Sequence, residues 1–318
     1  MAQKPLRIGV VMDPIGSITP KKDSTLAMLL EAARRNAEIH YFEQKDLKLL
    51  SGKAIGHATR LAVRDNLDDW FDFGERAVVE LGDLDAILMR KDPPFDMEYV
   101  YTTYILERAA AAGALIVNAP QALRDMNEKA YTAWFPQCTP ITLITRSMAE
   151  MKAFLGEHGK IVVKPLDGMG GRSIFVVGKG DNNANVIFET LTDYGRRFAM
   201  AQVYIPEIKA GDKRILLVDG EPVPYALARI PTGDDNRGNL VAGAVGKGQE
   251  LSERDLWIAR EVGPVLRDAG VIFAGLDVIG DYLTEVNVTS PTGVRELDRQ
   301  FGINIAGLLF DAIEKRLR

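Results

Sequence analysis

The chain is poor in the residues that build several common kinds of site. It has one cysteine, Cys138, and three histidines among 318 residues. A single thiol excludes an internal disulfide and a four-cysteine zinc site, and it is typical of proteins from a reducing cytoplasm. The histidines, at positions 40, 57 and 158, have no nucleophile motif beside them. Serine–histidine–aspartate catalysis is therefore disfavoured.

Long apolar runs and an excess of positive charge are also missing. The longest apolar stretch covers residues 109–117, far short of the roughly 20 residues that span a bilayer. Lys and Arg number 39 against 44 Asp and Glu, a net charge of -5, so no overall field favours nucleic acid. Hydrophobic residues make up 47% of the chain, as in an ordinary globular protein. We expect a soluble cytoplasmic protein that binds neither membrane nor nucleic acid.

The first third of the chain alternates between strand-like and helix-like segments. Buried strands are predicted at 6–12, 39–42, 84–89 and 114–117, with helices at 24–36 and 98–112. This alternation predicts an α/β domain over residues 1–123, built on a mostly parallel, Rossmann-like sheet. The polar stretch 45–76 lacks a clear period, and we expect it to run over the surface.

Beyond Pro120 the pattern changes to α+β. Pro120 can open a helix through 129, and Ser147 with Glu150 forms a capping-box pattern at the start of another. Short antiparallel strands and a final helix are then predicted, at 160–164, 172–177, 198–204, 214–218, 222–230, 271–279, 283–288 and 301–317. We expect a central lobe over 124–203 and a C-terminal lobe over 204–318.

A glycine-rich turn joins two of these short strands, in the sequence KPLDGMGG at 164–171. Glycines at 168, 170 and 171 leave backbone N–H groups free to converge on a phosphate, and Lys164 adds a positive charge. The turn fits neither the Walker A nor the Rossmann pattern. A plain glycine-rich hairpin remains the alternative.

Three oxygen-bearing side chains, Asp277, Glu285 and Asn287, stand in the apolar segment GLDVIGDYLTEVNV. Glu285 and Asn287 share one face of a strand, and all three offer the hard ligands that magnesium prefers. A two-residue turn at 280–281 would place Asp277 opposite Thr284, so Asp277 faces Glu285 only if the hairpin carries a bulge or an odd loop. A solvated strand face is the alternative, although unpaired charges in apolar strands are costly.

Four arginines are candidates for binding carboxylates or phosphates, because the planar guanidinium pairs with both. They are Arg214 and Arg229 on the two strands of one hairpin, whose turn is predicted at Asp219-Gly220, together with Arg237, and Arg90 in the first domain. Scattered surface charges are the alternative for any one of them. Arg237 lies in the glycine-rich stretch 231–248, which lacks helix or strand period and which we expect to form a lid.

Taken together, these features resemble the ATP-grasp ligases, and more narrowly the bacterial glutathione synthetases. The resemblance runs nearly end to end. It is carried by the segments 12–25, 89–107, 118–129, 164–175, 211–231, 237–240 and 285–293.

The resemblance implies roles for the candidate residues. Lys129 and Lys164 would hold ATP phosphates beneath the loop of Gly168, Met169, Gly170 and Gly171. Gln202, Val203, Tyr204 and Ile205 would meet adenine, with Asp212 on the ribose. Asp277, Glu285 and Asn287 would bind magnesium, or manganese. Arg214, Arg229 and Arg237 would act on the reacting groups. Arg90 and the segment Ser290, Pro291, Thr292 and Gly293 would bind substrate.

The resemblance also implies an activity, the ATP-dependent joining of γ-glutamylcysteine to glycine through an acyl phosphate. Members of this family are commonly homotetramers. Two alternatives remain open. One is another ATP-grasp ligase, which joins D-amino acids or adds glutamate to a protein, and the other is a nucleotide-binding module without catalysis.

Overall fold

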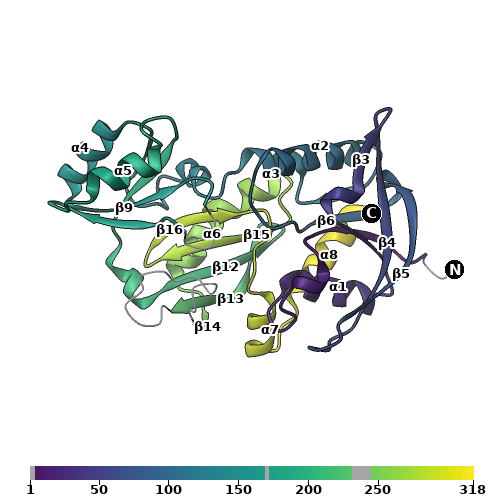
Figure 1. The fold of residues 1–318 in the computed structure, drawn as a ribbon. Helices are drawn as coiled ribbons and strands as arrows, with labels where there is room; N and C mark the ends of the chain where they lie inside the picture. The colour runs from purple at the N-terminus through teal and green to yellow at the C-terminus, as the bar shows by residue number, and fades with distance from the viewer. Residues whose placement is uncertain (1–3, 169–171, 231–244) are drawn as a thin grey trace.

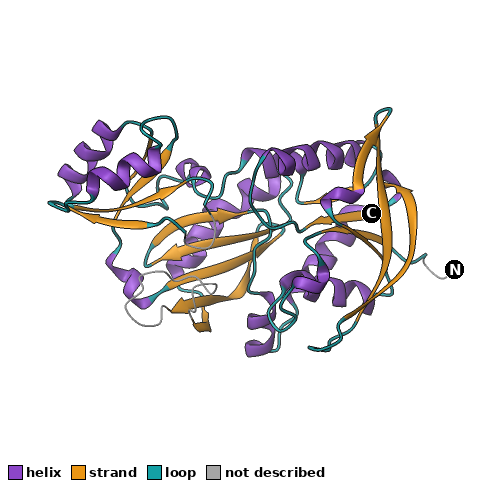
Figure 2. Cartoon of the chain, viewed as in Figure 1, coloured by secondary structure: helices purple, strands orange, loops and turns teal. Residues whose placement is uncertain are grey.

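The computed structural model describes residues 4–168, 172–230 and 245–318, which form three β-sheets with helices packed on them (Figures 1 and 2). The sheets follow one another along the chain. No helix within the described residues combines the length and the apolar character needed to cross a membrane.

The first sheet has seven strands, in the order β3-β4-β2-β1-β6-β7 with β5 beside β4. Strands β2, β1, β6 and β7 are parallel, as expected, whereas β3, β4 and β5 pair antiparallel. The bounds are β1 Arg7–Val11, β2 Glu38–Phe42, β3 Leu47–Leu50, β4 Lys53–Val63, β5 Phe71–Glu80, β6 Ala86–Met89 and β7 Leu115–Val117.

The surface excursion expected at 45–76 is wrong, because this stretch contains β3, β4 and the start of β5. Most side chains of β5 are exposed, so its sequence carries no apolar alternation. A strand that is solvated on both faces leaves little periodic signal for sequence analysis.

Helices cover both faces of the parallel part of this sheet. In the sequence, Asp23 and Ser24 are candidates for the cap of the first of these helices. Ile8 and Val10 of β1 face α1 (Ser24–Arg34) and α8 (Ile305–Leu317), whereas Val11 faces the side of α2 (Met97–Ala111) and α3 (Pro120–Asp125). Asp23 caps α1 by accepting from the Leu26 N–H at 2.6 Å. The helix predicted at 120–129 is shorter than expected, since it ends at Asp125.

The second sheet is antiparallel, in the order β10-β9-β11-β8, and its helices lie on one face. Ser147 caps the helix predicted from the capping-box pattern. Met151, Phe188 and Val163 belong to a core separate from the rest of the molecule. The bounds are β8 Thr142–Thr145, α4 Met148–His158, β9 Lys160–Pro165, β10 Phe175–Gly178, α5 Ala184–Thr192 and β11 Ala199–Val203.

The third sheet is also antiparallel, in the order β14-β13-β12-β15-β16. Asp219 and Gly220 both have positive φ, 51° and 83°, and form the predicted two-residue turn between β12 and β13. The bounds are β12 Asp212–Val218, β13 Glu221–Ile230, β14 Val245–Glu250, α6 Glu253–Asp268, β15 Phe273–Ile279, β16 Tyr282–Asn287 and α7 Val294–Phe301.

Two expectations for this part need correction. Residues 245–248 belong to strand β14, so the aperiodic stretch predicted at 231–248 is shorter; residues 231–244 lie outside the described part. The final helix predicted at 301–317 begins at 305, because Gly302 at φ 64° ends α7 and Asn304 caps α8.

Short 3-10 helices connect the main elements. They are η1 Ile15–Ser17, η2 Gln44–Asp46, η3 Leu81–Asp83, η4 Ala130–Trp134 and η5 Pro206–Ala210. Of these, η1 and the residues after it lead into α1, and η4 leads from the first domain into the second sheet.

Candidate active site

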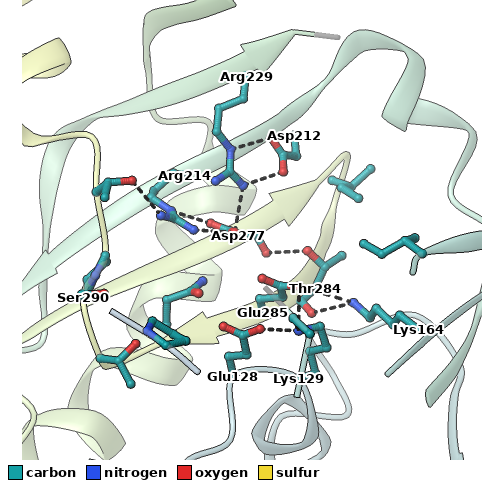
Figure 3. Close-up of a pocket in the computed structure, with 18 of the residues that line it drawn as sticks. Glu128, Lys129, Lys164, Asp212, Arg214, Arg229, Asp277, Thr284, Glu285 and Ser290 are labelled. Atoms are coloured by element: carbon teal, nitrogen blue, oxygen red, sulfur yellow. Dashed lines mark hydrogen bonds and ion pairs between the residues drawn. The ribbon is translucent and has the colours of Figure 1, made fainter. Parts of the chain in front are cut away.

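A cavity of about 940 Å³ is lined by residues of all three sheet regions. Most of the predicted site residues in the described part line it. They are Lys129, Lys164, Gly168, Gln202, Val203, Tyr204, Ile205, Asp212, Arg214, Arg229, Asp277, Glu285, Asn287, Ser290, Pro291 and Thr292. Figure 3 shows how the charged members converge from separate strands and, for Lys129, from the residue before η4.

The β15–β16 hairpin carries the bulge that the metal hypothesis required. Ile279 pairs with Tyr282 and Val278 with Leu283, but Asp277 pairs with Glu285. Thr284 is therefore the extra residue, and its hydroxyl donates to the Asp277 carbonyl at 3.0 Å. The bulge places Asp277 and Glu285 side by side, which a regular two-residue hairpin would not do.

Asp277 lies between two arginines from neighbouring strands (Figure 3). Arg214 donates to it through Nε at 2.8 Å and through its Nη2 at 2.7 Å, and Arg229 Nη2 lies 2.8 Å from the same carboxylate. Arg229 also donates to Asp212 through Nε at 2.8 Å. Burial alone would raise the pKa of Asp277, but Arg214 and Arg229 hold that pKa well below its usual range.

Gly275 makes room for this arrangement. A Cβ at position 275 would lie 2.9 Å from Pro291 Cβ and 3.4 Å from Arg214 Cδ. A side chain there would displace either the 290–292 segment or the arginine. Glycine on β15 thus lets Arg214 pass across the sheet toward Asp277.

The two lysines gather near Glu285. Lys129 Nζ lies 3.8 Å and Lys164 Nζ 3.9 Å from its carboxylate, and Lys129 also donates to Glu128 and to the Gly168 carbonyl. Burial lowers the pKa of Lys164. Burial, and next the charge of Glu285, raises the pKa of Glu128 to about 7. Two carboxyl groups, those of Glu128 and Glu285, therefore lie beside the two lysines, and Glu128 takes up a proton more readily than an ordinary glutamate.

The segment from Gln202 to Ile205 lines the cavity together with apolar side chains. Gln202 Nε2 donates to Thr142 Oγ1 at 3.0 Å, and the Lys160 ammonium lies 3.8 Å from the Tyr204 ring centroid. Apolar neighbours around this segment are Val162, Ile174, Val176, Ile208 and Ile279. A flat apolar group such as a nucleobase fits such a lining.

The segment 290–293 forms another wall of the cavity. Ser290 donates to Asp92, and Thr292 Oγ1 accepts from Arg214 Nη1 at 3.4 Å. Arg90 lies behind this wall, where it donates to the Pro291 carbonyl at 3.0 Å and to Thr25 at 3.1 Å. Neither Arg90 nor Gly293 is among the residues that line the cavity.

The remaining predicted residues, Met169, Gly170, Gly171 and Arg237, lie outside the described residues. Within the described part, no group of three or more His, Cys, Asp or Glu side chains could hold a metal ion by itself. Asp277, Glu285 and Asn287 include one amide, so a hard cation here needs oxygen ligands from a bound phosphate as well.

Comparisons with known proteins agree with this arrangement. The family model described as prokaryotic glutathione synthetase, N-terminal domain, matches residues 6–124, and that described as prokaryotic glutathione synthetase, ATP-grasp domain, matches residues 128–302. The chain belongs to the prokaryotic glutathione synthetase family. It is an ATP-dependent ligase, as the resemblance implied.

Individual relatives are similar over nearly the whole chain. The glutathione synthetase of Salmonella typhimurium is 60% identical over 312 residues, which cover 98% of this chain and 99% of that one. That of Escherichia coli strain K12 is 58% identical over 313 residues, with the same coverage of 98% and 99%.

Solved structures share the fold at low sequence identity. The D-cycloserine synthetase DcsG has a TM-score of 0.68 at 16% identity, covering 98% of this chain and 100% of that chain. The D-alanine–D-alanine ligase of Bacillus anthracis has a TM-score of 0.60, also at 16% identity, covering 98% and 97%. The predicted α/β domain followed by an ATP-grasp fold is confirmed.

Sequence analysis did not identify several residues of this family member's cavity. Glu128, Asp92 and Thr284 line it, and Glu128 stands directly before the predicted Lys129. A charged pair at the start of an otherwise apolar segment was the available signal for Glu128. No local pattern marks Asp92 or Thr284, because their importance comes from pairing with residues far away in the sequence.

Proposed function

We propose that the chain joins the cysteinyl carboxylate of γ-glutamylcysteine to the amine of glycine and converts ATP to ADP and phosphate. Membership of the family supports ATP as cosubstrate and supports γ-glutamylcysteine and glycine as the two substrates that are joined. The observation that carries the mechanism is the convergence of two lysines, two arginines and three oxygen ligands in one cavity.

The reaction needs activation because a carboxylate has no adequate leaving group for attack by an amine. Transfer of the γ-phosphoryl group to the carboxylate creates an acyl phosphate, and the glycine amine then displaces phosphate from the acyl carbon. Negative charge moves onto the phosphoryl and acyl oxygens during both steps. Fixed cations that are already in place stabilise this charge without rearrangement.

Lys129 and Lys164 are suited to the phosphates of ATP, because both ammonium groups point toward the same region beside Glu285. Arg214 and Arg229 are suited to the acyl phosphate, since their guanidinium groups are held in place by Asp277 and Asp212. The role of such a site is alignment and charge neutralisation rather than proton transfer.

Asp277, Glu285 and Asn287 fit a hard divalent cation, magnesium or manganese, that is shared with the phosphates. When bound, such a cation would neutralise phosphate charge as the phosphoryl group leaves. The Asp277 carboxylate is engaged by Arg214 and Arg229, so Glu285 and Asn287 would supply the less committed oxygens.

The remaining residues are also proposed to bind parts of ATP or the peptide substrate. Gln202 to Ile205 would meet adenine, Asp212 the ribose, Gly168 to Gly171 the phosphates, and Ser290 to Gly293 the peptide substrate. Arg90, from behind the wall, would hold the 290–293 segment in position through the Pro291 carbonyl. Arg237 would act on the acyl phosphate.

We also propose that the chain consists of an N-terminal domain, residues 1–123, a central lobe, residues 124–203, and a C-terminal lobe, residues 204–318. We propose that four such chains form a cytoplasmic homotetramer. The separate core of the second sheet supports a unit within residues 124–203, from Leu143 to Ala201, whereas Tyr131, Phe135 and Cys138 pack in the core shared by the first and third sheets. Light scattering on a size-exclusion column measures the assembly, and a monomer across the micromolar range would contradict it.

The function is tested by incubating the purified protein with ATP, magnesium, γ-glutamylcysteine and glycine. We expect equal amounts of ADP and tripeptide, and oxygen-18 from the cysteinyl carboxylate should appear in the released phosphate. Label that stays in the peptide would exclude the acyl phosphate. Turnover with D-alanine in place of both substrates would favour the alternative ligase.

A further inference from the structure

The cavity extends past the 290–293 segment to a second region, where the first domain meets α7. One wall of this region consists of the segment that precedes α1, and the other begins at Thr292 and continues into α7. Residues of the two walls that line the cavity are Ser17, Thr19, Lys22, Asp23, Thr292 and Glu296.

Hydrogen bonds hold these two walls against each other. The Val294 N–H donates to Ser24 Oγ at 3.2 Å, and Arg299 Nη2 donates to the Lys21 carbonyl at 2.7 Å. Lys22 stands between these two anchor points, and Glu296 stands between their partners on α7. The relative placement of Lys22 and Glu296 is therefore determined by the fold.

Most charged groups at this end of the cavity already have partners. Asp13 pairs with Lys91 at 2.9 Å and accepts from the Asp92 N–H at 3.0 Å. Asp23 is used as the cap of α1. These carboxylates are committed to the protein itself.

Glu296 differs from them. Its Oε2 is buried without a hydrogen-bond partner among the described residues. Burial raises the pKa of Glu296, and that rise is opposed first by a hydrogen bond from its own backbone N–H and then by the charges of Lys22, Arg299 and Arg295. The buried Oε2 of Glu296 thus lacks a hydrogen-bond partner within the described part of the chain, which is costly unless a ligand completes it. Lys22, an exposed residue, lines the cavity on the opposite wall.

We propose that Lys22 and Glu296 recognise the free α-amino acid head of the γ-glutamyl residue, with its α-ammonium on Glu296 and its α-carboxylate on Lys22. This inference rests on the proposed function. A γ-linked glutamyl residue carries both charges on one carbon, at the end opposite the reacting cysteinyl carboxylate. A single zwitterionic group matches one carboxylate and one ammonium on facing walls.

The distance from the reacting end is suitable. From the glutamyl α-carbon to the cysteinyl carboxylate, the substrate spans about two residues of extended chain, roughly 7 Å. Thr292 contacts Arg214 at the reacting end, and Glu296 follows it four positions later in the sequence. The substrate can therefore lie along the 290–296 wall from Arg214 to Glu296.

Two analogues each remove one charge from the substrate. N-glutaryl-cysteine lacks the α-ammonium, and 4-aminobutanoyl-cysteine lacks the α-carboxylate. With the unmodified enzyme we expect N-glutaryl-cysteine to raise KM relative to γ-glutamylcysteine by roughly tenfold or more, because the buried Glu296 Oε2 is left without its partner. We expect 4-aminobutanoyl-cysteine to raise KM by a smaller factor, because Lys22 is exposed and water can replace the missing carboxylate.

The variants Glu296→Gln and Lys22→Met then complete two thermodynamic cycles. Glu296→Gln should raise KM for γ-glutamylcysteine roughly tenfold and change KM for N-glutaryl-cysteine little. Lys22→Met should likewise raise KM for γ-glutamylcysteine and change KM for 4-aminobutanoyl-cysteine little. The matched controls are Lys21→Met, at the neighbouring lysine, and Glu221→Gln, on β13. Neither control should change KM for γ-glutamylcysteine or for its analogues.

The outcomes separate the two proposals. If γ-glutamylcysteine is no substrate of the unmodified enzyme, the proposed function fails. If it is a substrate but each variant raises KM equally for the full substrate and for its analogue, Glu296 and Lys22 act only structurally and the inference is overturned. Analogues that react as well as γ-glutamylcysteine overturn it too. Thermal unfolding shows whether each variant is folded, and KM values are compared only among folded variants.

Discussion

At the residue scale, the central feature is the neutral cluster of Asp277, Asp212, Arg214 and Arg229. Two carboxylates offset two guanidinium groups, and Arg214, Arg229 and Asp277 are each less than 10% exposed. Buried ion pairs are weak contributors to stability while intact, but loss of one member leaves an uncompensated charge. In this protein the cluster holds in place the two arginines that we propose for the acyl phosphate, so we expect stability and activity to depend on the same groups.

The variant Asp277→Asn should therefore lose both stability and activity. We expect the free energy of unfolding to fall by about 3 kcal/mol or more, because Arg214 loses both of its carboxylate contacts. Turnover should fall by about 100-fold or more, since the arginines and any bound cation lose their orientation. Urea unfolding and steady-state kinetics measure the two effects.

Asp255→Asn is the matched control, because Asp255 is fully buried and accepts from Lys213 at 2.6 Å, outside the cavity. It should lose stability and keep its kcat. Equal losses of kcat in the two variants would contradict a specific role for Asp277 in the reaction.

At the element scale, close contacts between helices and strand turns decide where the strands that line the cavity lie. Helix α6 packs on the third sheet at the turn between β12 and β13, the strands that carry Arg214 and Arg229. A Cβ on Gly263 would lie 2.0 Å from the Gly220 carbonyl oxygen. The close approach of helix and turn requires glycine at position 263.

Gly263→Ala should destabilise the protein, although alanine favours helix by about 1 kcal/mol over glycine. The clash involves backbone on both sides, so neither partner moves cheaply, and we expect a net loss of about 2 kcal/mol. Gly156→Ala in α4 is the control, since nothing lies within 4 Å of its added Cβ, and it should gain up to about 1 kcal/mol. Urea unfolding distinguishes them, and a gain in both variants would contradict the proposed packing.

At the scale of the whole molecule, the first and third sheets are joined, whereas the second stands apart. One continuous core contains Val11 and Leu106 from the first sheet region and Ile215 and Leu276 from the third. Helix α8, the last element of the chain, packs on α1 near the N-terminus (Figure 1). Arg35 connects these helices by donating to Glu31 and Glu314, each at 2.7 Å, and to Asp311 at 2.7 Å.

This connection predicts a dependence of stability on pH. Hydrogen bonds from Arg34 lower the pKa of Glu31 to about 2, with a further contribution from Arg35, against a usual value of 4.5. A lowered carboxyl pKa contributes stability that is present above about pH 4.5 and is lost as the pH falls toward 2. The ion pairs of Glu31 should therefore weaken only in acid.

Glu31→Gln removes this contribution. The difference in urea midpoint between the unmodified protein and Glu31→Gln should be largest at pH 6 and should shrink steadily below about pH 4.5. Glu98→Gln, at an exposed carboxylate on α2, should show no such trend. A difference that stays constant from pH 6 to pH 3 would refute the assignment.

Local signals in the sequence were enough for much of the fold. The apolar runs of β1, β6 and β7 and the caps at Asp23 and Ser147 each depend on a few neighbouring residues, and the structure confirms them. The turn at Asp219-Gly220 was also readable, because only a few residue types accept positive φ at both positions. The exposed strand β5 was not readable, since water on both of its faces removes the apolar period.

By itself, the sequence determined the family, the order of its elements and most of the charged residues that line the cavity, because these depend on residue type and spacing. Only the tertiary structure decided which charges meet. The bulge at Thr284 sets Asp277 beside Glu285, Gly275 admits Arg214, and the anchors at Ser24 and Lys21 hold the segment that contains Lys22 against α7. Such pairings join residues far apart in the chain, and no local pattern records them because packing and long-range hydrogen bonds create them.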